Sequence, residues 1–381
     1  MDFLLSEEQK MLRTMARDFA DRELEPIAAR IDEEAVFPAE SFQKMARLGL
    51  LGVGLPKKYG GGDGGAIESG IVVEEISRVC AGMGTILLVS QGLVGHLLDV
   101  YCNEEQKKTF LTTVATGEKL AAFALTEPGV GSDPADIETT ATPHQNGYLL
   151  NGSKTFITNG AEAEISVIFA SVDKSLRHKG IAAFIVERGA SGFSVGKLVH
   201  KLGIRCSSTT ELILKDCFVP EENRVGKDGE GFKIAMNSID ASRVAIAAQA
   251  VGIAQGAFDK SVAYARQRQQ FGKPIASFEA IQWMLADMAT QIDAARLLTY
   301  RAANLQDKGF PFVKEASMAK LFASEAAASV TTKAIQIHGG YGYTTEYPLE
   351  RYFRDARITE IYEGTSEMQR LTIARHILRD N

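Results

Sequence analysis

The sequence predicts an α+β fold that is mainly α, with a helical part, a β part and a second helical part in that order. Three observations support this prediction. Apolar residues recur at helical spacing before residue 120, short apolar segments separated by Gly, Asp and Lys follow it, and long alanine-rich runs begin near Gly231. We therefore place the domains at residues 1–120, 121–228 and 229–381.

The N-terminal domain begins with a helix whose first residues, Ser6 to Gln9, fit a capping box. Further helices are expected at residues 71–79 and 85–100, and the second is apolar on nearly all sides, which predicts that it is buried. The glycine-rich stretch 60–65 satisfies the letters of a dinucleotide-binding motif, but alternating strands and helices do not follow it, so we interpret it as a loop. The apolar residues with helical spacing in the first helix are Met11, Leu12, Met15, Ala16 and Phe19.

The middle domain is predicted to be a small antiparallel sheet, folded as a barrel or a sandwich. Tyr148 to Phe156 is interpreted as a hairpin with Asn151 and Gly152 in its turn, because Asn-Gly is the dipeptide that two-residue hairpin turns favour. The other strands are expected at residues 121–126, 165–170, 181–186 and 210–214.

The C-terminal domain is predicted to be a bundle of long helices at residues 232–266, 278–304 and 313–337. Glycines interrupt the first of them, and we expect them to permit a close approach of neighbouring helices. A last helix is expected from Glu367 to Leu378, with Thr365 or Ser366 as its cap.

Composition excludes several classes of function. A net charge of -6 and a pI near 5.7 argue against a nucleic-acid-binding protein. The six histidines are scattered without a zinc pattern, so we expect no metal site, and the four cysteines lack metal spacing, so we expect them to be reduced. We find neither a signal peptide nor an apolar run of membrane-spanning length, and therefore expect a cytoplasmic enzyme without membrane insertion.

Glu363 is the acidic residue best placed to act as a base. Gly364 follows it and lets the backbone turn sharply, so the carboxylate is expected on a tight bend between two helical segments. On this stretch alone, a solvated loop charge remains the alternative.

Three other segments carry residues suited to ligand binding. The loop from Leu125 to Asp133 offers glycines, hydroxyls and backbone N–H groups that can cradle a pyrophosphate, although it also fits an ordinary turn. Phe156 and Thr158 share one face of a strand, where they can stack on a flat ring and bond its edge or simply form part of the sheet. Arg268 at a helix end suits a phosphate or bulk solvent.

Taken together, these segments resemble the acyl-CoA dehydrogenases along the whole chain, and most closely the short-chain or butyryl-CoA dehydrogenases of bacteria. The two longest motifs are residues 124–133, Ala-Leu-Thr-Glu-Pro-Gly-Val-Gly-Ser-Asp, and the segment from Gln336 through Gly339-Gly340-Tyr341-Gly342 to Asp355. Three shorter motifs in family order are Phe156-Ile157-Thr158, Arg268-x-x-Phe271-Gly272 and Tyr362-Glu363-Gly364-Thr365.

The resemblance implies an acyl-CoA dehydrogenase fold with an N-terminal helical domain, a middle antiparallel β domain and a C-terminal four-helix bundle, assembled as a homotetramer. It implies that FAD lies between the β and C-terminal domains and that electrons pass to electron-transfer flavoprotein. The implied reaction is α,β-dehydrogenation of an acyl-CoA thioester. Glu363 would take the α-proton while flavin N5 takes the hydride from the β-carbon.

The resemblance also assigns individual residues. Thr126 and Thr158 would bond the isoalloxazine, Phe156 would lie against it, and Ser132 would lie near the pyrophosphate or the CoA. Arg268, Phe271 and the segment Gln336 to Gly340 would reach the cofactor of a neighbouring subunit. Asp240 and Arg243 would meet the CoA portion. The remaining residues assigned to the cofactor are Phe123, Leu125, Gly131, Phe278, Gly339, Thr365 and Glu367, and the remaining ones assigned to the substrate are Tyr362 and Gly364.

Some residues depart from the family pattern. Asp136 stands where a small residue is usual, and Glu279 stands where many relatives have glutamine. Polar Gln91 and His96 occur in the segment that corresponds to the acyl-pocket wall, which favours a cyclic, aromatic or dicarboxylic acyl group beside a short straight chain, unless both side chains face away. An acyl-CoA oxidase that uses oxygen, and a non-catalytic acyl-CoA-binding or scaffold protein, are the alternative functions.

Overall fold

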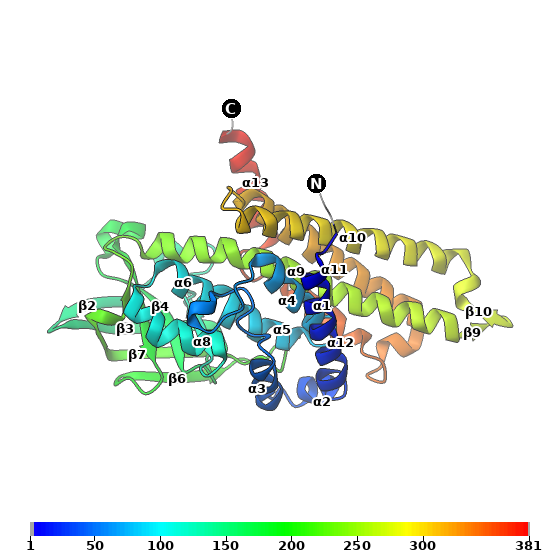
Figure 1. Ribbon diagram of the computed structural model, residues 1–381, viewed down its shortest axis with the longest axis horizontal. Helices are drawn as coiled ribbons and strands as arrows, with labels where there is room; N and C mark the ends of the chain where they lie inside the picture. The colour runs from blue at the N-terminus through cyan, green and yellow to red at the C-terminus, as the bar shows by residue number, and fades with distance from the viewer. Residues whose placement is uncertain (1–3, 380–381) are drawn as a thin grey trace.

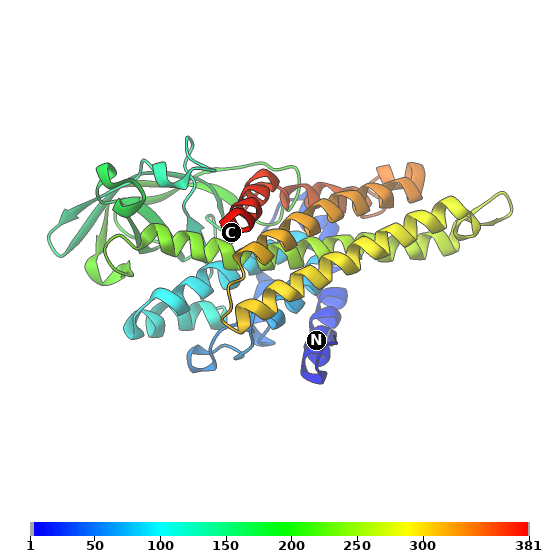
Figure 2. The same cartoon turned by 90° about the horizontal axis from the view of Figure 1, so that it is seen from above.

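The computed structural model describes residues 4–379 and has the α+β, mainly α architecture that the sequence predicts (Figure 1). Residues 1–3 and 380–381 lie outside the described residues. They include the first residue of the predicted N-terminal domain and the last residue of the predicted C-terminal domain. The molecule is elongated, with the β domain at one end and a short hairpin at the other (Figures 1 and 2).

The N-terminal helices pack around an apolar core. The predicted capping box is present, because Gln9 N donates to Ser6 Oγ at 3.2 Å and Ser6 N donates to Gln9 Oε1 at 2.9 Å. The α-helices are α1 (Glu7–Phe19), α2 (Ala28–Glu33), α3 (Ala39–Arg47), α4 (Ala66–Ser77), α5 (Ala81–Leu87), α6 (His96–Tyr101), α7 (Glu104–Gln106) and α8 (Thr112–Thr116), and wider π-helical segments span η1 (Ala20–Leu24), η3 (Leu88–Gly95) and η4 (Lys107–Leu111).

The helical run Ala81–Tyr101 corrects one expectation. It is long and apolar enough to cross a membrane by length and composition, although the sequence was expected to contain no such run. Its most apolar window is 89% buried inside the protein. The run is therefore a helical segment of the core, and the burial predicted for residues 85–100 is confirmed.

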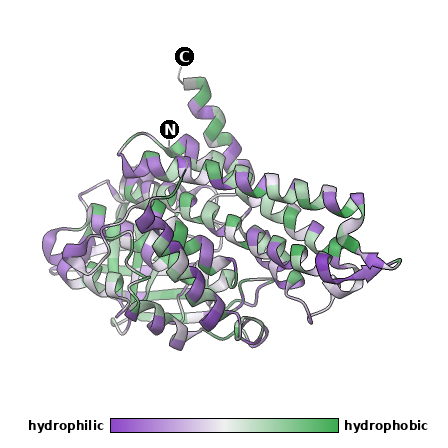
Figure 3. Ribbon diagram, turned by 45° about the vertical axis from the view of Figure 1, so that its right-hand side comes forward, coloured by the Kyte–Doolittle hydropathy of each residue, from purple (hydrophilic) through white to green (hydrophobic). Residues whose placement is uncertain are grey.

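The middle domain is built on one eight-stranded sheet of order β6-β7-β3-β2-β4-β5-β8, with β1 beside β4. The pairing is antiparallel except that β1 and β2 each run parallel to β4. Hydrophobic residues recur along its strands (Figure 3), and many of them form a buried apolar cluster. The strands are β1 (Ala121–Ala124), β2 (Thr140–His144), β3 (Gly147–Thr158), β4 (Ile165–Ser171), β5 (Ile181–Glu187), β6 (Phe193–Leu198), β7 (Thr209–Pro220) and β8 (Arg224–Val225).

The predicted turn at Asn151 and Gly152 is wrong. Both residues lie inside β3, where the register against β7 shifts and Gly152 has a φ of 148°. The Asn151 side chain bonds across to β7, accepting from Asp216 N at 2.8 Å. The dipeptide therefore forms a β-bulge, and the hairpin turn lies earlier, at Gln145, which has a φ of 50°.

The C-terminal helices are long and close-packed, as predicted. Gly252 on α9 lets this helix approach α4, because a Cβ atom there would lie 2.2 Å from the carbonyl oxygen of Glu74. Helix α9 extends from the β domain to the hairpin (Figure 2). The elements are α9 (Gly231–Gln267), β9 (Gln269–Gln270), β10 (Lys273–Pro274), α10 (Glu279–Asp307), α11 (Val313–His338), α12 (Leu349–Ile358) and α13 (Ser366–Arg379).

Candidate active site

The turn between α12 and α13 holds Glu363 in a conformation that residues other than glycine rarely adopt. Glu363 has a φ of 53° and Gly364 has a φ of 93°. A positive φ at a residue with a side chain persists only where the surroundings enforce it, and such residues cluster at functional sites. The bend was predicted from Gly364, whereas the strained conformation of Glu363 was not.

Side chains from three helices hold the two carbonyl groups of this turn. Lys320 Nζ on α11 donates to Gly364 O at 2.7 Å. Gln369 Nε2 on α13 donates to the same oxygen at 2.8 Å and to Glu363 O at 3.2 Å. Arg243 Nε on α9 donates to Glu363 O at 3.4 Å. The turn is therefore fixed from α9, α11 and α13 at once.

The Glu363 carboxyl group has the electrostatics of a base. Burial raises its pKa to about 6, while the positive charges of Lys320 and Arg243 act against that rise. Among the residues that the structure describes, none donates a hydrogen bond to this carboxylate. A partly buried carboxylate that titrates near neutrality and has no internal partner is suited to accept a proton from a ligand.

Lys320 contacts the turn from α11, and the sequence analysis did not select it. Its side chain is fully buried, and burial lowers its pKa to about 8, with the negative charge of Glu363 acting in the opposite direction. One sequence signal marks it, because it stands on the same helical stripe as the buried Ala316, Ala319 and Ala323.

Asp240 and Arg243 lie beside the turn, one helical turn apart on α9. The Arg243 guanidinium bonds to the Asp240 carboxylate and also to the carbonyl of Glu363. Burial raises the pKa of Asp240, and the Arg243 charge opposes this rise. The structure therefore brings Asp240, Arg243 and Glu363 together.

Tyr362 starts a buried chain of polar groups beneath the turn. Its hydroxyl donates to the side-chain oxygen of Gln249, whose Nε2 donates to Thr85 Oγ1 at 2.7 Å and to Ala81 O at 2.9 Å. Gln249 and Thr85 are both fully buried. Neither was predicted, because a single buried glutamine or threonine in a helix has no distinctive sequence pattern.

A buried ion pair organises the loop that follows β1. Lys154 Nζ on β3 lies 2.7 Å from Glu127 Oε1 and donates to Leu125 O at 3.1 Å. Glu127 also accepts from the backbone N–H groups of Glu138 and Thr139. The loop is thereby fixed against β3, and the position of Thr126 next to Leu125 is fixed with it.

The residues predicted to meet a flat ring lie beside this ion pair. Thr155 N donates to Thr126 O at 2.9 Å, which places Thr126 next to the end of β3. Phe156 follows with a φ of 57° and with 64% of its surface exposed. Thr126 and Thr158 are partly exposed, so this part of the chain offers an exposed aromatic ring and two accessible hydroxyl-bearing residues, which suits a planar heterocycle.

The other predicted residues of the β domain divide into two groups. Gly131 and Ser132 are exposed, so they are open to a ligand. The side chains of Phe123 and Leu125 pack into the core, with the Phe123 ring 4.9 Å from that of Phe169. Leu125 is buried, whereas Phe123 remains partly exposed.

A second group of predicted residues surrounds a cavity of about 520 Å³ near the β9–β10 hairpin. Arg268, Gly339 and Gly340 line it, and a Cβ atom at either glycine would meet nothing within 4 Å. The Arg268 guanidinium lies 5.6 Å from the centre of the Tyr341 ring. Phe271 is 92% exposed. Gln336 is exposed as well, and the Phe278 ring lies 6.1 Å from that of Phe271.

The two groups of predicted cofactor residues lie far apart in one chain. The β domain and the β9–β10 hairpin occupy opposite ends of the long axis (Figures 1 and 2). Phe156 belongs to β3 in the β domain, whereas Arg268 directly precedes β9 of the hairpin. Thr365 and Glu367 lie apart from the hairpin, at the start of α13, where Thr365 Oγ1 accepts from Met368 N at 3.5 Å.

Gln91 and His96 lie on and beside η3. Gln91 is buried, and neither its amide nitrogen nor its oxygen has a partner in the part of the chain that the structure describes. Burial lowers the pKa of His96.

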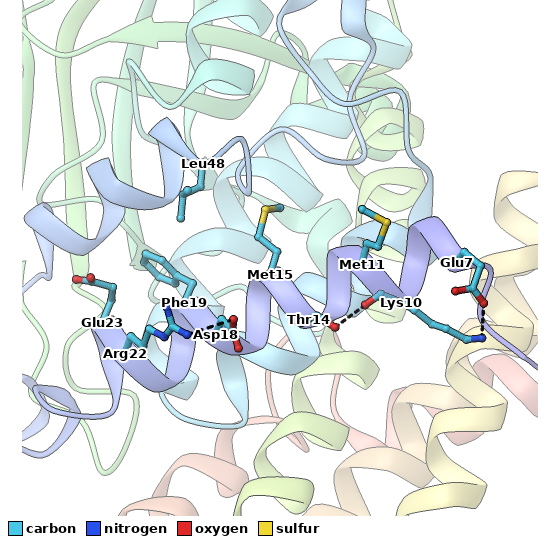
Figure 4. A pocket seen from close by; sticks show the side chains of 10 residues that line it. All are labelled: Glu7, Lys10, Met11, Thr14, Met15, Asp18, Phe19, Arg22, Glu23 and Leu48. Carbon is cyan, nitrogen blue, oxygen red and sulfur yellow. Dashed lines mark hydrogen bonds and ion pairs between the residues drawn. The ribbon is translucent and has the colours of Figure 1, made fainter.

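A larger groove, of about 630 Å³, lies elsewhere, along α1 (Figure 4). Met11, Met15 and Leu48 form its apolar part, and charged side chains of α1 surround them. None of the predicted site residues lines this groove.

Family models match all three parts of the chain. They are described as the N-terminal domain of acyl-CoA dehydrogenase at residues 6–118, its middle domain at residues 122–217 and its C-terminal domain at residues 229–378.

Two relatives match over all of this chain. One is the "Acyl-CoA dehydrogenase, short-chain specific" of Clostridium acetobutylicum, which is 50% identical over all of its own length. The other is the "Acryloyl-CoA reductase (NADH)" of Anaerotignum propionicum, which is 52% identical over 96% of its own length.

Two solved structures match over their full lengths and over all of this chain. The butyryl-CoA dehydrogenase from Megasphaera elsdenii has a TM-score of 0.98 and 44% identity. A chain in a structure described as the electron transferring flavoprotein of Acidaminococcus fermentans has a TM-score of 0.99 and 47% identity.

Proposed function

The chain belongs to the acyl-CoA dehydrogenase family of FAD-dependent oxidoreductases, and from this premise we propose that it oxidises a short-chain acyl-CoA thioester to the 2-enoyl-CoA. Glu363 is proposed to remove the α-proton. The observation that carries this assignment is the Glu363 carboxylate itself, which is held on a fixed turn, has a pKa raised to about 6 and receives no hydrogen bond from residues 4–379.

The residues around the turn support such a step. Arg243 and Lys320 favour the ionised carboxylate, so that the base is charged at neutral pH. After Glu363 accepts the α-proton, its neutral form is stabilised by the same burial that raises its pKa. Asp240 and Arg243, next to the turn, are proposed to meet the CoA portion. The bound flavin supplies an acceptor for the hydride that leaves the β-carbon.

The residues fit FAD if two copies of the chain form each site. Phe156, Thr126 and Thr158 offer one ring face and two hydroxyls, while Arg268 and the open glycine pair Gly339 and Gly340 suit the phosphate-bearing part. Because these groups lie at opposite ends of one chain, we propose that they meet across an interface in a homotetramer. The high exposure of Phe271, 92%, supports such an interface, since an exposed aromatic side chain is often covered by a partner.

A short acyl group is proposed because the relatives that match over all of the chain include a short-chain specific dehydrogenase and a butyryl-CoA dehydrogenase. Whether Gln91 and His96 admit a cyclic, aromatic or dicarboxylic group is addressed by a panel of acyl-CoA thioesters with an artificial electron acceptor. Full activity with butyryl-CoA and none with the bulkier thioesters would support the proposal.

The direction of the reaction has a second candidate. The relative described as an acryloyl-CoA reductase is 52% identical, which favours reduction of a 2-enoyl-CoA as the reverse use of the same site. Electron-transfer flavoprotein is proposed as the redox partner, in keeping with the family and with the similar chain from the Acidaminococcus structure. Rates measured with this partner, with oxygen and with NADH separate a dehydrogenase from an oxidase and from a reductase.

The decisive experiment replaces Glu363 with glutamine. E363Q should remain yellow and bind acyl-CoA, but kcat should fall by a factor of about 10²–10⁴ because the general base is lost. The matched control is E325Q on α11, where the exposed carboxylate forms an ion pair with Arg370. Substantial turnover by E363Q would refute the assignment of the base, and a colourless wild-type protein would refute the cofactor fit.

A further inference from the structure

We propose that Lys320 is the residue that positions the base: its buried ammonium group holds the Gly364 carbonyl and thereby the left-handed turn that carries Glu363. The inference rests on the proposed function, in which Glu363 removes the α-proton. It concerns a residue that touches the turn from another helix and acts on the reaction only through Glu363.

The first argument is the unusual placement of the Lys320 charge. The other two lysines of α11 form ion pairs, Lys314 with Glu315 at 3.8 Å and Lys333 with Asp287 at 3.1 Å. Lys320 instead points into the protein and is 0% exposed. Its Nζ donates a hydrogen bond of 2.7 Å to the backbone carbonyl of Gly364. Burying an ammonium group is costly, so an apolar residue would stabilise this stripe of α11 better.

The second argument is the conformation that this hydrogen bond maintains. The Gly364 carbonyl has two donors, Lys320 from α11 and Gln369 from α13. Both residues of the turn have positive φ angles, 53° at Glu363 and 93° at Gly364. Because Glu363 prefers a negative φ, loss of the ammonium group removes one donor from the peptide between Gly364 and Thr365 and allows the turn to relax, and this relaxation re-aims the carboxylate.

The third argument is the electrostatic effect of nearby positive charges on the Glu363 carboxylate. A buried positive charge on Lys320 favours the ionised form of Glu363, and Arg243 adds to it from α9. The pKa of Glu363 is about 6 and that of Lys320 is about 8, so both groups are charged between these values. The other charged or titratable groups that face this pair are Asp240 on α9, Glu360 and Tyr362 on the turn, and Glu367 on α13.

The test compares the pH dependence of kcat/KM in three variants of the flavin-loaded enzyme. K320M removes the charge at similar length, K320R keeps a charge, and K333M removes a lysine charge from the outside of the same helix. We expect the acid limb of K320M to move up by about one pH unit, because loss of a nearby opposite charge shifts a pKa by about 1–3 units. The smaller ionised fraction of Glu363 alone then lowers kcat/KM of K320M about fivefold relative to the wild type at pH 6 and hardly at all at pH 8.

A second readout needs no turnover. Infrared difference spectra of each protein against its own E363Q version follow the protonated carboxyl band of Glu363 as the pH is varied. The band midpoint should be higher in K320M than in the wild type and unchanged in K333M, with K320R close to the wild type. K320Q serves as the uncharged variant where K320M does not fold.

Failure of the proposed function and failure of the proposed role of Lys320 give different results. A wild-type protein that oxidises no acyl-CoA refutes the proposed function. A wild type that turns over, together with a K320M or K320Q enzyme whose acid limb and carboxyl band match it, refutes the positioning role of Lys320. A uniform loss of activity at all pH values that K320R does not restore, with an unchanged carboxyl midpoint, equally refutes it, since a merely structural defect produces that pattern.

Discussion

The buried pair of Lys154 and Glu127 allows a sharp test of how the β domain holds its ligand loop. Replacing Lys154 with methionine removes the cation but leaves the Glu127 carboxylate, which is 4% exposed, inside the protein. Leu125 O also loses its donor, so the loop that carries Thr126 loses one of its attachments to β3. We expect lower stability and weaker retention of the flavin.

The magnitude follows from what remains around Glu127. Leaving a buried charge unpaired costs about 3–5 kcal/mol. The backbone N–H groups of Glu138 and Thr139 still donate to this carboxylate, so we expect the lower end, about 3 kcal/mol. In the double variant E127Q/K154M no charge is buried, and the cost should fall to about 1 kcal/mol. The difference between the two variants is the energetic signature of the ion pair.

Denaturation with guanidinium, followed by helix circular dichroism and by flavin release, measures both effects at a fixed protein concentration. The matched control is K119M, because Lys119, just before β1, forms a half-exposed ion pair with Glu187 at the end of β5 at 2.9 Å. A surface pair of this kind contributes about 0–1 kcal/mol. If K154M were as stable as K119M, or if E127Q/K154M were no more stable than K154M, the reasoning would be wrong.

Three further predictions follow from titrating or hydrogen-bonded groups. The kcat/KM of the wild type should fall below pH 6, because Glu363 must be ionised to act as a base; a profile flat to pH 4 contradicts this. E363Q should be more stable than the wild type at pH 7 by up to about 2 kcal/mol in thermal unfolding, because the raised pKa means that ionisation of Glu363 disfavours the folded state above pH 6. Burial raises the pKa of Cys102 to about 12 and of Cys217 to about 11, so iodoacetamide at pH 8 should label neither thiol in the native protein by mass spectrometry, and rapid labelling would contradict their burial.

The order of domains and the long helices could be predicted because their signals are local. Helix α9 was expected at residues 232–266 and spans Gly231–Gln267, since a continuous alanine-rich pattern leaves little ambiguity. The bulge at Asn151 and Gly152 was misread for a physical reason. Both a hairpin turn and a bulge require a residue that tolerates unusual φ angles, and only the pairing with β7 distinguishes them.

The site could be predicted only where a residue is marked by its own neighbours in sequence. Glu363 is marked by Gly364 after it, whereas Lys320 is marked only by the alanines around it. Its contact with Gly364 spans 44 residues, and that of Arg243 with Glu363 spans 120. Contacts of this kind depend on how α9, α11 and α13 pack, and no local pattern encodes them.

The features that make this turn a credible site are also those that lower the stability of the fold. A positive φ at Glu363, a carboxylate without an internal donor and a fully buried ammonium group each cost free energy that a chain selected for stability alone would avoid. Their effects converge on one property, since burial raises the pKa of Glu363 while Lys320 and Arg243 limit that rise. The result is a carboxylate that is ionised at neutral pH yet basic enough to take a proton. If E363Q is both inactive and more stable than the wild type, burial of the Glu363 carboxylate accounts both for the activity and for the lower stability of the wild-type fold.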